Sequence, residues 1–215
     1  MAHHAQSAFE PRKSPVQARS TLTVEAIFEA TIQVLLSHGT DRLTTTRVAE
    51  RAGVSVGTLY QYYPNKQSLL FAVLEDHLDK VAAAVEIACQ RARGKPLEEM
   101  VKDVAEAFVD AKMRRTDIST ALYRIAAEVG GPALVKRTGQ RSEKALEAML
   151  RTAPDAALQQ DKFAIQMMFA AMAGATRSVL EAGASPAMVR KVRDHLALLC
   201  QSYMLAVAGR RDPSG

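Results

Sequence analysis

Residues 45–63, with the sequence TTRVAERAGVSVGTLYQYY, constrain the fold more than any other part of the chain. A helix-turn-helix packs two short helices at a steep angle and therefore demands particular residue types at fixed positions. Ala49 is small where the second helix must cross, Gly53 permits a positive φ at the turn, and Ser55 can cap the second helix. The miniature core would be closed by Val48, Ala52, Val54 and Leu59. An ordinary amphipathic helix pair would meet only one or two of these demands by chance, so the segment predicts a helix-turn-helix.

The second helix of this pair is the candidate reader of a DNA major groove, because a recognition helix presents its outer face and N-terminal half to base edges. Gln61 can bond adenine, and Val56 or Thr58 can touch a thymine methyl group. The alternative is that the tyrosines are half-buried core residues, which suits Tyr63 best. The candidate reading positions are Val56, Gly57, Thr58, Tyr60, Gln61 and Tyr62.

Two further features predict contacts with phosphate groups. Thr44, Thr45 and Thr46 open the first helix of the pair; one of them can cap it, and free amides at a helix N-terminus bind anions. Lys66 follows the expected cap Asn65 in the first turn of the next helix, where a cation opposes the helix dipole. We expect a DNA phosphate to explain Lys66, since helix stability does not.

The rest of the chain predicts an all-α fold, since no segment shows sustained strand alternation. Apolar residues recur at helical spacing, and Gly and Pro mark the breaks. Thr23 is the expected cap of the first helix, which His38-Gly39 ends. Pro132 and Pro186 suit first-turn positions, and Ser185 is a good cap before the latter. The expected helices span about 23–37, 45–52, 55–62, 66–92, 97–114, 117–129, 132–152, 160–182 and 186–208.

Composition narrows the class of protein. The chain has 215 residues, 48% of them apolar, and a net charge of +5, which is compatible with a nucleic-acid partner but weak evidence for one. Apolar stretches such as 163–175 are shorter than a membrane span needs, and the N-terminus has no secretory signal, so we expect a cytoplasmic protein. Cys89 and Cys200 are expected to be buried thiols, with a redox sensor as the alternative. No pattern indicates a metal, a cofactor or a catalytic constellation.

Residues 22–70 closely resemble the N-terminal domain of the tetracycline-repressor (TetR) family. The resemblance is carried by AERAGVSVGTLYQYYPNKQSLL, preceded by LTTTRVA and by a helix that ends in HG. It implies three N-terminal helices with the reader as the third, and a fourth helix that leads into a C-terminal bundle. Phe is common in the family where this chain has Tyr63. The family pattern places these residues on DNA: Thr45, Thr46, Val56, Gly57, Thr58, Tyr60, Gln61, Tyr62 and Lys66.

The resemblance also implies a homodimer and a small-molecule inducer bound in the C-terminal bundle. The expected dimer interface is formed by the helices near 160–182 and 186–208, although an intramolecular core would show the same small and apolar residues. His77 and Glu128 would be polar handles in a pocket, but a surface position suits each better. The pocket candidates, which are equally typical of plain core, are Phe108, Met113, Tyr123, Phe163, Met167, Met168, Phe169 and Met172.

The predicted organisation has four parts: a flexible basic arm (1–20), a helix-turn-helix domain (21–65), a ligand-binding and dimerisation domain (66–208) and a disordered tail (209–215). The arm, with Arg12, Lys13 and Arg19, is either a solvated tail or a segment that lies along DNA. The predicted function is a transcriptional repressor that a ligand releases from a palindromic operator. The alternatives are an activator, a regulator without a ligand, and an all-α enzyme or carrier.

Overall fold

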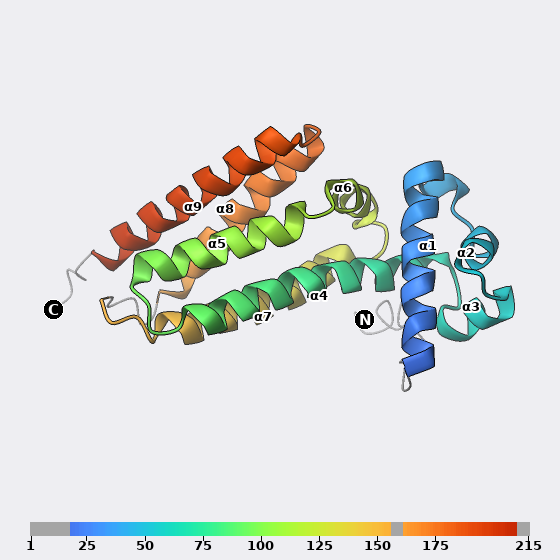
Figure 1. Ribbon diagram of the computed structural model, residues 1–215, viewed down its shortest axis with the longest axis horizontal. Coiled ribbons are helices and arrows are strands. Elements are labelled where there is room, and N and C mark those ends of the chain that lie inside the picture. Colours follow the sequence, from blue (N-terminus) through green and yellow to red (C-terminus); the bar gives the residue numbers. More distant parts are fainter. Residues whose placement is uncertain (1–17, 156–160, 210–215) are drawn as a thin grey trace, which may run out of the picture. The chain divides into compact units, whose positions relative to one another are not determined.

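The computed structural model describes residues 18–155 and 161–209, which form helices and turns without any strand. The all-α prediction is confirmed (Figure 1). The helices are α1 (Ala18–Arg42), α2 (Thr45–Ala52), α3 (Val56–Tyr62), α4 (Lys66–Ala92), α5 (Leu97–Met113), α6 (Thr116–Ile125), α7 (Gly131–Leu150), α8 (Lys162–Glu181) and α9 (Pro186–Ala208).

The first helix departs from its predicted start. It begins at Ala18, so Thr23 lies inside the helix and is not its cap. The reason is that no helix breaker stands between Pro15 and Gly39, and the helix extends back past the threonines. At the other end, Gly39 has φ 73° and ψ 176°, which breaks the regular helix where it was predicted to end.

The predicted arm and tail fall mostly outside the described residues. Residues 18–20 of the arm are helical, and Gly209 is the C-cap of α9; the remaining residues of both segments are not described. The described residues form two compact units, one within residues 18–78 and 120–135 and one within residues 79–119, 136–155 and 161–209. The helix α4 therefore contributes residues to both units. The functional division into 21–65 and 66–208 stays a prediction.

The first unit holds the helix-turn-helix. The helix α1 packs against α2, and α2 packs against α3. Ile27 and Val34 of α1 are buried, as are Leu43 before α2 and Leu69 at the start of α4. Burial of this apolar set stabilises α2 and α3, which at 8 and 7 residues would be unstable alone.

The second unit is a helical bundle in which α5 packs against both α8 and α9 (Figure 1). At the exposed edge of the α5–α9 contact, Arg193 of α9 binds two carboxylates of α5. Its guanidinium donates two hydrogen bonds to Glu106 at 3.1 Å and one to Asp110 at 2.9 Å. On another side of the unit, Arg141 of α7 bonds Asp79 and Glu86 of α4. These charged pairs fix the rotation of α9 and α7 about their axes, while apolar burial supplies most of the stability.

The helix α8 corrects one prediction. It is 20 residues long, and its best window has a mean hydropathy of 1.3, so by length and composition it could cross a membrane. The run was underestimated because Val179 and Leu180 extend it beyond Ala175, with Arg177 as the only charged residue among the three between. A core helix of a soluble protein passes the same test, and α8 packs against α5 and α9.

Candidate nucleic-acid interface

The core of the helix-turn-helix follows the predicted pattern. Val48, Ala49 and Leu59 have no exposed surface. Gly53 ends α2 with φ 68° and ψ 30°, and its N–H donates to the carbonyls of Ala49 and Glu50. Val54 is only half-buried. The left-handed turn at Gly53 is therefore what brings α3 across α2.

A side-chain cap stands at the start of each of the helices α2, α3 and α4. Thr44 Oγ1 accepts a hydrogen bond from the N–H of Arg47 at 3.3 Å, and Ser55 Oγ accepts one from Thr58 at 2.9 Å. Asn65 Oδ1 accepts from the N–H of Ser68 at 2.8 Å, and Ser68 Oγ accepts in return from the N–H of Asn65 at 3.3 Å. All three predicted caps are confirmed. The reciprocal pair at α4 is the equivalent of a capping box, with serine in the usual place of glutamate.

The helix α3 turns most of its side chains away from the core. Leu59 is its only buried residue. Gly57, Tyr60 and Gln61 are exposed, whereas Val56, Thr58 and Tyr62 are half-buried. Every candidate reading position therefore keeps some accessible surface.

Thr45 and Tyr60 are joined in a way that the sequence pattern did not reveal. Thr45 is only 9% exposed, and its Oγ1 lies 3.1 Å from the hydroxyl of Tyr60. The Thr45 side chain is therefore largely buried and bonded to Tyr60, and a contact between Thr45 and DNA stays a prediction. Thr46, the next residue, is exposed. The hydrogen bond between the two hydroxyl groups restricts the position of the Tyr60 ring.

Lys66 also has a structural partner. Its Nζ donates to the carbonyl oxygen of Thr40 at 3.0 Å, which ties the start of α4 to the end of α1. Lys66 therefore has a structural partner that the sequence did not reveal, and its contact with a DNA phosphate stays a prediction. An ammonium has three donors, so two N–H groups remain after this bond.

Tyr63 lies inward, as the alternative for the tyrosines predicted. It is 3% exposed, and its ring lies 5.9 Å from that of Phe28. Burial, with smaller contributions from Asp76 and Tyr62, raises the pKa of the Tyr63 hydroxyl above its ordinary value. The residue therefore serves the core, as the Phe of related chains would.

The pocket candidates separate into interior and surface residues. Phe108, Met113, Met168 and Met172 are buried; the rings of Phe108 and Phe169 meet edge to face at 6.4 Å. Phe163 and Met167 are 67% and 45% exposed, which speaks against a pocket position for them. Tyr123 is half-buried and belongs to the first compact unit.

Large hydrophobic side chains are exposed on both α8 and α9, and we call the surface that carries them the α8–α9 face. On α8 the residues Phe163, Met167, Ala170 and Gly174 share one side through helical spacing. On α9 the exposed apolar residues are Met188, Leu198, Leu199 and Leu205. Several large exposed hydrophobic side chains on adjacent helices indicate an interaction surface.

Cys89 and Cys200 are both buried. Burial raises the pKa of the Cys89 thiol to about 12 and that of Cys200 to about 11. Protonated thiols of this kind are poor nucleophiles, which favours the structural role over a redox sensor.

Comparison with family models identifies both parts of the chain. Residues 27–73 match the model described as bacterial regulatory proteins, tetR family, and residues 96–204 match the tetracyclin repressor-like C-terminal domain. The chain belongs to the tetR family. The first match contains the helix-turn-helix, and the second contains α8 and α9. A tetR-family protein is a DNA-binding transcriptional regulator by class.

Curated relatives of this tetR-family chain are regulators, matched over part of their length. The transcriptional repressor KstR of Mycolicibacterium smegmatis is 37% identical over 62 residues, which are 29% of this chain and 30% of KstR. The A-factor receptor protein of Streptomyces griseus is 28% identical over 119 residues, 54% of this chain and 40% of that protein. The chain thus spans less than half the length of these two relatives.

Solved structures show the same tetR-family fold. A tetR-family regulator from Mesorhizobium loti superimposes with a TM-score of 0.73 at 15% identity, over 89% of this chain and 98% of that one. The fatty acid degradation regulator FadR of Bacillus halodurans gives a TM-score of 0.65 at 18% identity, over 86% and 96% of the two chains. At these identities the likeness concerns the fold alone.

Proposed function

We propose that this tetR-family chain is a sequence-specific transcriptional repressor that binds a palindromic operator and leaves it when a small molecule binds the C-terminal helical domain. The observation that carries the proposal is the geometry of α3, whose single buried residue leaves the reading positions accessible. KstR, which matches the N-terminal part, is named a transcriptional repressor. The cytoplasm is the expected location, and neither a membrane nor a cofactor is needed.

The contacts with DNA fall into two groups. Gln61 is the candidate for hydrogen bonds to adenine, and Val56 and Thr58 can contact thymine methyl groups, while Gly57 allows close approach of the backbone. Tyr60, Tyr62, Thr46 and Lys66 are assigned to phosphates, which set the register without reading sequence.

Thr45 acts through Tyr60 in this proposal. The hydrogen bond between their hydroxyls restricts the exposed ring before DNA arrives. A side chain that is already ordered loses less conformational entropy on binding. Lys66 is prepared in the same way by its bond to Thr40.

The operator is expected to be two-fold symmetric because the protein is expected to be a homodimer. The α8–α9 face supplies an apolar surface on two adjacent helices, and a second copy of the same face would cover it around a two-fold axis. Two readers placed one helical turn apart, about 34–36 Å, would then contact two half-sites.

The ligand is expected to bind the second compact unit. The A-factor receptor protein, a relative over 119 residues, is named as a receptor. Phe108, Met113, Met168 and Met172 are the candidates for its apolar contacts, and methionine adapts to varied ligand shapes. These residues are packed as core in the structure, so ligand entry would require them to rearrange.

The proposal is tested by fluorescence anisotropy with the DNA upstream of the protein's own coding sequence and with a scrambled duplex, at two salt concentrations. We expect tight binding of the first duplex only, with dimer stoichiometry. Equal, weak and salt-sensitive binding of both duplexes would contradict the proposal.

Variants then test the assigned contacts. Gln61→Ala should cost about 1–3 kcal/mol of discrimination at one base position. Lys66→Ala should weaken binding to every duplex and lower the salt slope by about one. Lys102→Ala removes the same charge from an exposed position on α5 and should change neither quantity.

A further inference from the structure

An open groove of about 860 Å³ lies between α1 and α2 in the first compact unit. Its floor is apolar: Val34 is 5% exposed, and Leu36, at 41%, is one of the large hydrophobic side chains left on the surface. Its walls are polar or charged. The complete lining is Gln33, Val34, Leu36, Ser37, His38, Arg47, Glu50 and Arg51.

Two arginines dominate the charge of this groove. Arg47 and Arg51 are four residues apart on α2 and therefore lie on the same side of it, where like charges repel. Arg47 also stands in the first turn of α2, where the helix dipole disfavours a cation. Arg51 stands in the last turn of α2, where the dipole favours a cation, so the local cost falls on Arg47 and on the repulsion between the two charges.

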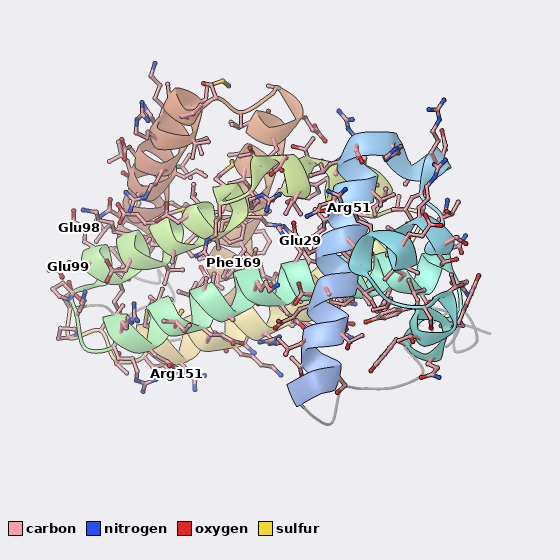
Figure 2. The ribbon with its side chains drawn as sticks, turned by 45° about the vertical axis from the view of Figure 1, so that its right-hand side comes forward. Glu29, Arg51, Glu98, Glu99, Arg151 and Phe169 are labelled. Atoms are coloured by element: carbon pink, nitrogen blue, oxygen red, sulfur yellow. The ribbon has the colours of Figure 1, made fainter. Side chains whose placement is uncertain are left out.

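Both guanidinium groups are held in place, but by neutral acceptors. Arg47 Nη1 donates to the Arg42 carbonyl at 2.8 Å, and Arg51 Nε donates to Gln33 Oε1 at 2.6 Å. Gln33 in turn donates to Glu29 at 3.0 Å, so Arg51 is positioned by Gln33 and Glu29 of α1. Figure 2 labels Glu29 and Arg51.

Neither arginine forms an ion pair with a carboxylate of residues 18–155 or 161–209, although Glu50 lines the same groove. Arg193 shows the contrast, since its guanidinium donates to the carboxylates of Glu106 and Asp110. The guanidinium groups of Arg47 and Arg51 are therefore ordered, and their charge is uncompensated. That combination suits recognition of an anion with little loss of entropy.

The groove lies on a different side of α2 from the proposed DNA contacts. Thr46 and Arg51 are five residues apart, which places their side chains about 140° apart around the helix axis. Leu36 and Val34 provide no charge or hydrogen bond for a phosphate backbone, whereas the exposed Leu36 can contact an apolar side chain of a protein segment. These features favour a protein segment over nucleic acid as the occupant.

We propose that this α1–α2 groove docks an acidic segment of a partner protein, with carboxylates on Arg47 and Arg51 and an apolar side chain over Leu36. Arginine and carboxylate pair through two parallel hydrogen bonds, and each arginine keeps donors for such a pair. Because the groove faces away from Thr46, the partner can bind while the reader helix occupies an operator. Only this last statement depends on the proposed function.

The test is selection from a phage-displayed library of random 12-residue peptides on the full-length protein, with counter-selection on the Arg47→Ala/Arg51→Ala variant. We expect enriched sequences to combine Asp or Glu with a large apolar residue. A synthetic enriched peptide should bind the double variant and Leu36→Ser at least tenfold more weakly. Binding should be unchanged in Arg91→Ala/Arg151→Ala, which removes two exposed arginines elsewhere.

Three results would overturn the proposal: no enrichment of acidic sequences, equal affinity of the enriched peptide for parent and double variant, or a loss of operator affinity in the double variant with a salt slope lower by about two. The last result would make the groove a phosphate site. An Arg47→Lys/Arg51→Lys variant keeps both positive charges but cannot form two parallel hydrogen bonds with a carboxylate, so its peptide affinity should also fall. Because lysine is a smaller change than alanine, this variant is less prone to misfold. A parent protein that binds the peptide but no operator would contradict the proposed function and leave the docking intact.

Discussion

Truncation of Leu198 on the α8–α9 face should weaken dimerisation without changing the fold of the single chain. The side chain is 60% exposed in the isolated chain, so that part is available for burial by a second copy. Complete burial of a leucine is worth about 1.5–3 kcal/mol, which gives about 1–2 kcal/mol for each Leu198. A two-fold dimer contains two copies, so Leu198→Ala should raise the dimer dissociation constant roughly 30- to 900-fold, from about 2–4 kcal/mol.

Sedimentation equilibrium over a range of concentrations measures this constant directly. The matched control is Ile87→Ala, because Ile87 is similarly apolar and 46% exposed but lies on α4. The midpoint of thermal unfolding, extrapolated to low concentration, should be the same for both variants and the parent. Equal dimer dissociation constants for Leu198→Ala and Ile87→Ala would refute the assignment of the α8–α9 face as the dimer interface.

Three further predictions concern stability. Gly53→Ala should lower the free energy of unfolding, measured in urea, by about 1–2 kcal/mol because φ is +68°. The same change at Gly139, in α7 with open space around it, should raise the free energy of unfolding by about 0.5–1 kcal/mol. A loss of stability at both sites would contradict the reasoning. Asn65→Ala removes the cap of α4 and should cost about 1 kcal/mol by the same measurement, with the loss absent if the cap contributes nothing. Burial raises the pKa of the Cys89 and Cys200 thiols above the ordinary 9.0, so near pH 10 the thiols ionise mainly in the unfolded chain. The free energy of unfolding should therefore fall between pH 8 and 10 by roughly 1 kcal/mol per thiol, relative to a Cys89→Ala/Cys200→Ala variant. Parallel pH profiles of the parent and this variant would contradict the prediction.

The sequence predicted the helices best where strong local signals enclose them. The bounds of α4 were expected at 66 and 92 and are found there, because Pro64 and Asn65 start the helix while Gly94 and Pro96 stop it. The helix α6 was expected to reach 129 but ends at Ile125. Residues 126–129 have no breaker among them, and a close contact decides the end: the N–H of Gly131 donates to the Ala126 carbonyl at 2.7 Å.

In the candidate DNA interface, too, local interactions were predictable and long-range ones were not. The caps Thr44, Ser55 and Asn65 were predictable because each bonds a backbone N–H three residues away. The bonds from Thr45 to Tyr60 and from Lys66 to Thr40 join residues 15 and 26 positions apart. Such pairs depend on how the helices cross and which rotamers they permit, and hydrophobic periodicity carries no information about either.

The single buried side chain of α3 has a consequence for how such regulators diverge. Leu59 anchors the helix to Val48 and Ala49, while its neighbours on the outer face take no part in that anchoring. If Gln61 and Gly57 read DNA as proposed, mutations at these exposed positions can change the preferred DNA sequence with little loss of folding stability. After gene duplication, two copies could acquire separate targets through a few such substitutions, and natural selection would act on binding preference largely independently of stability.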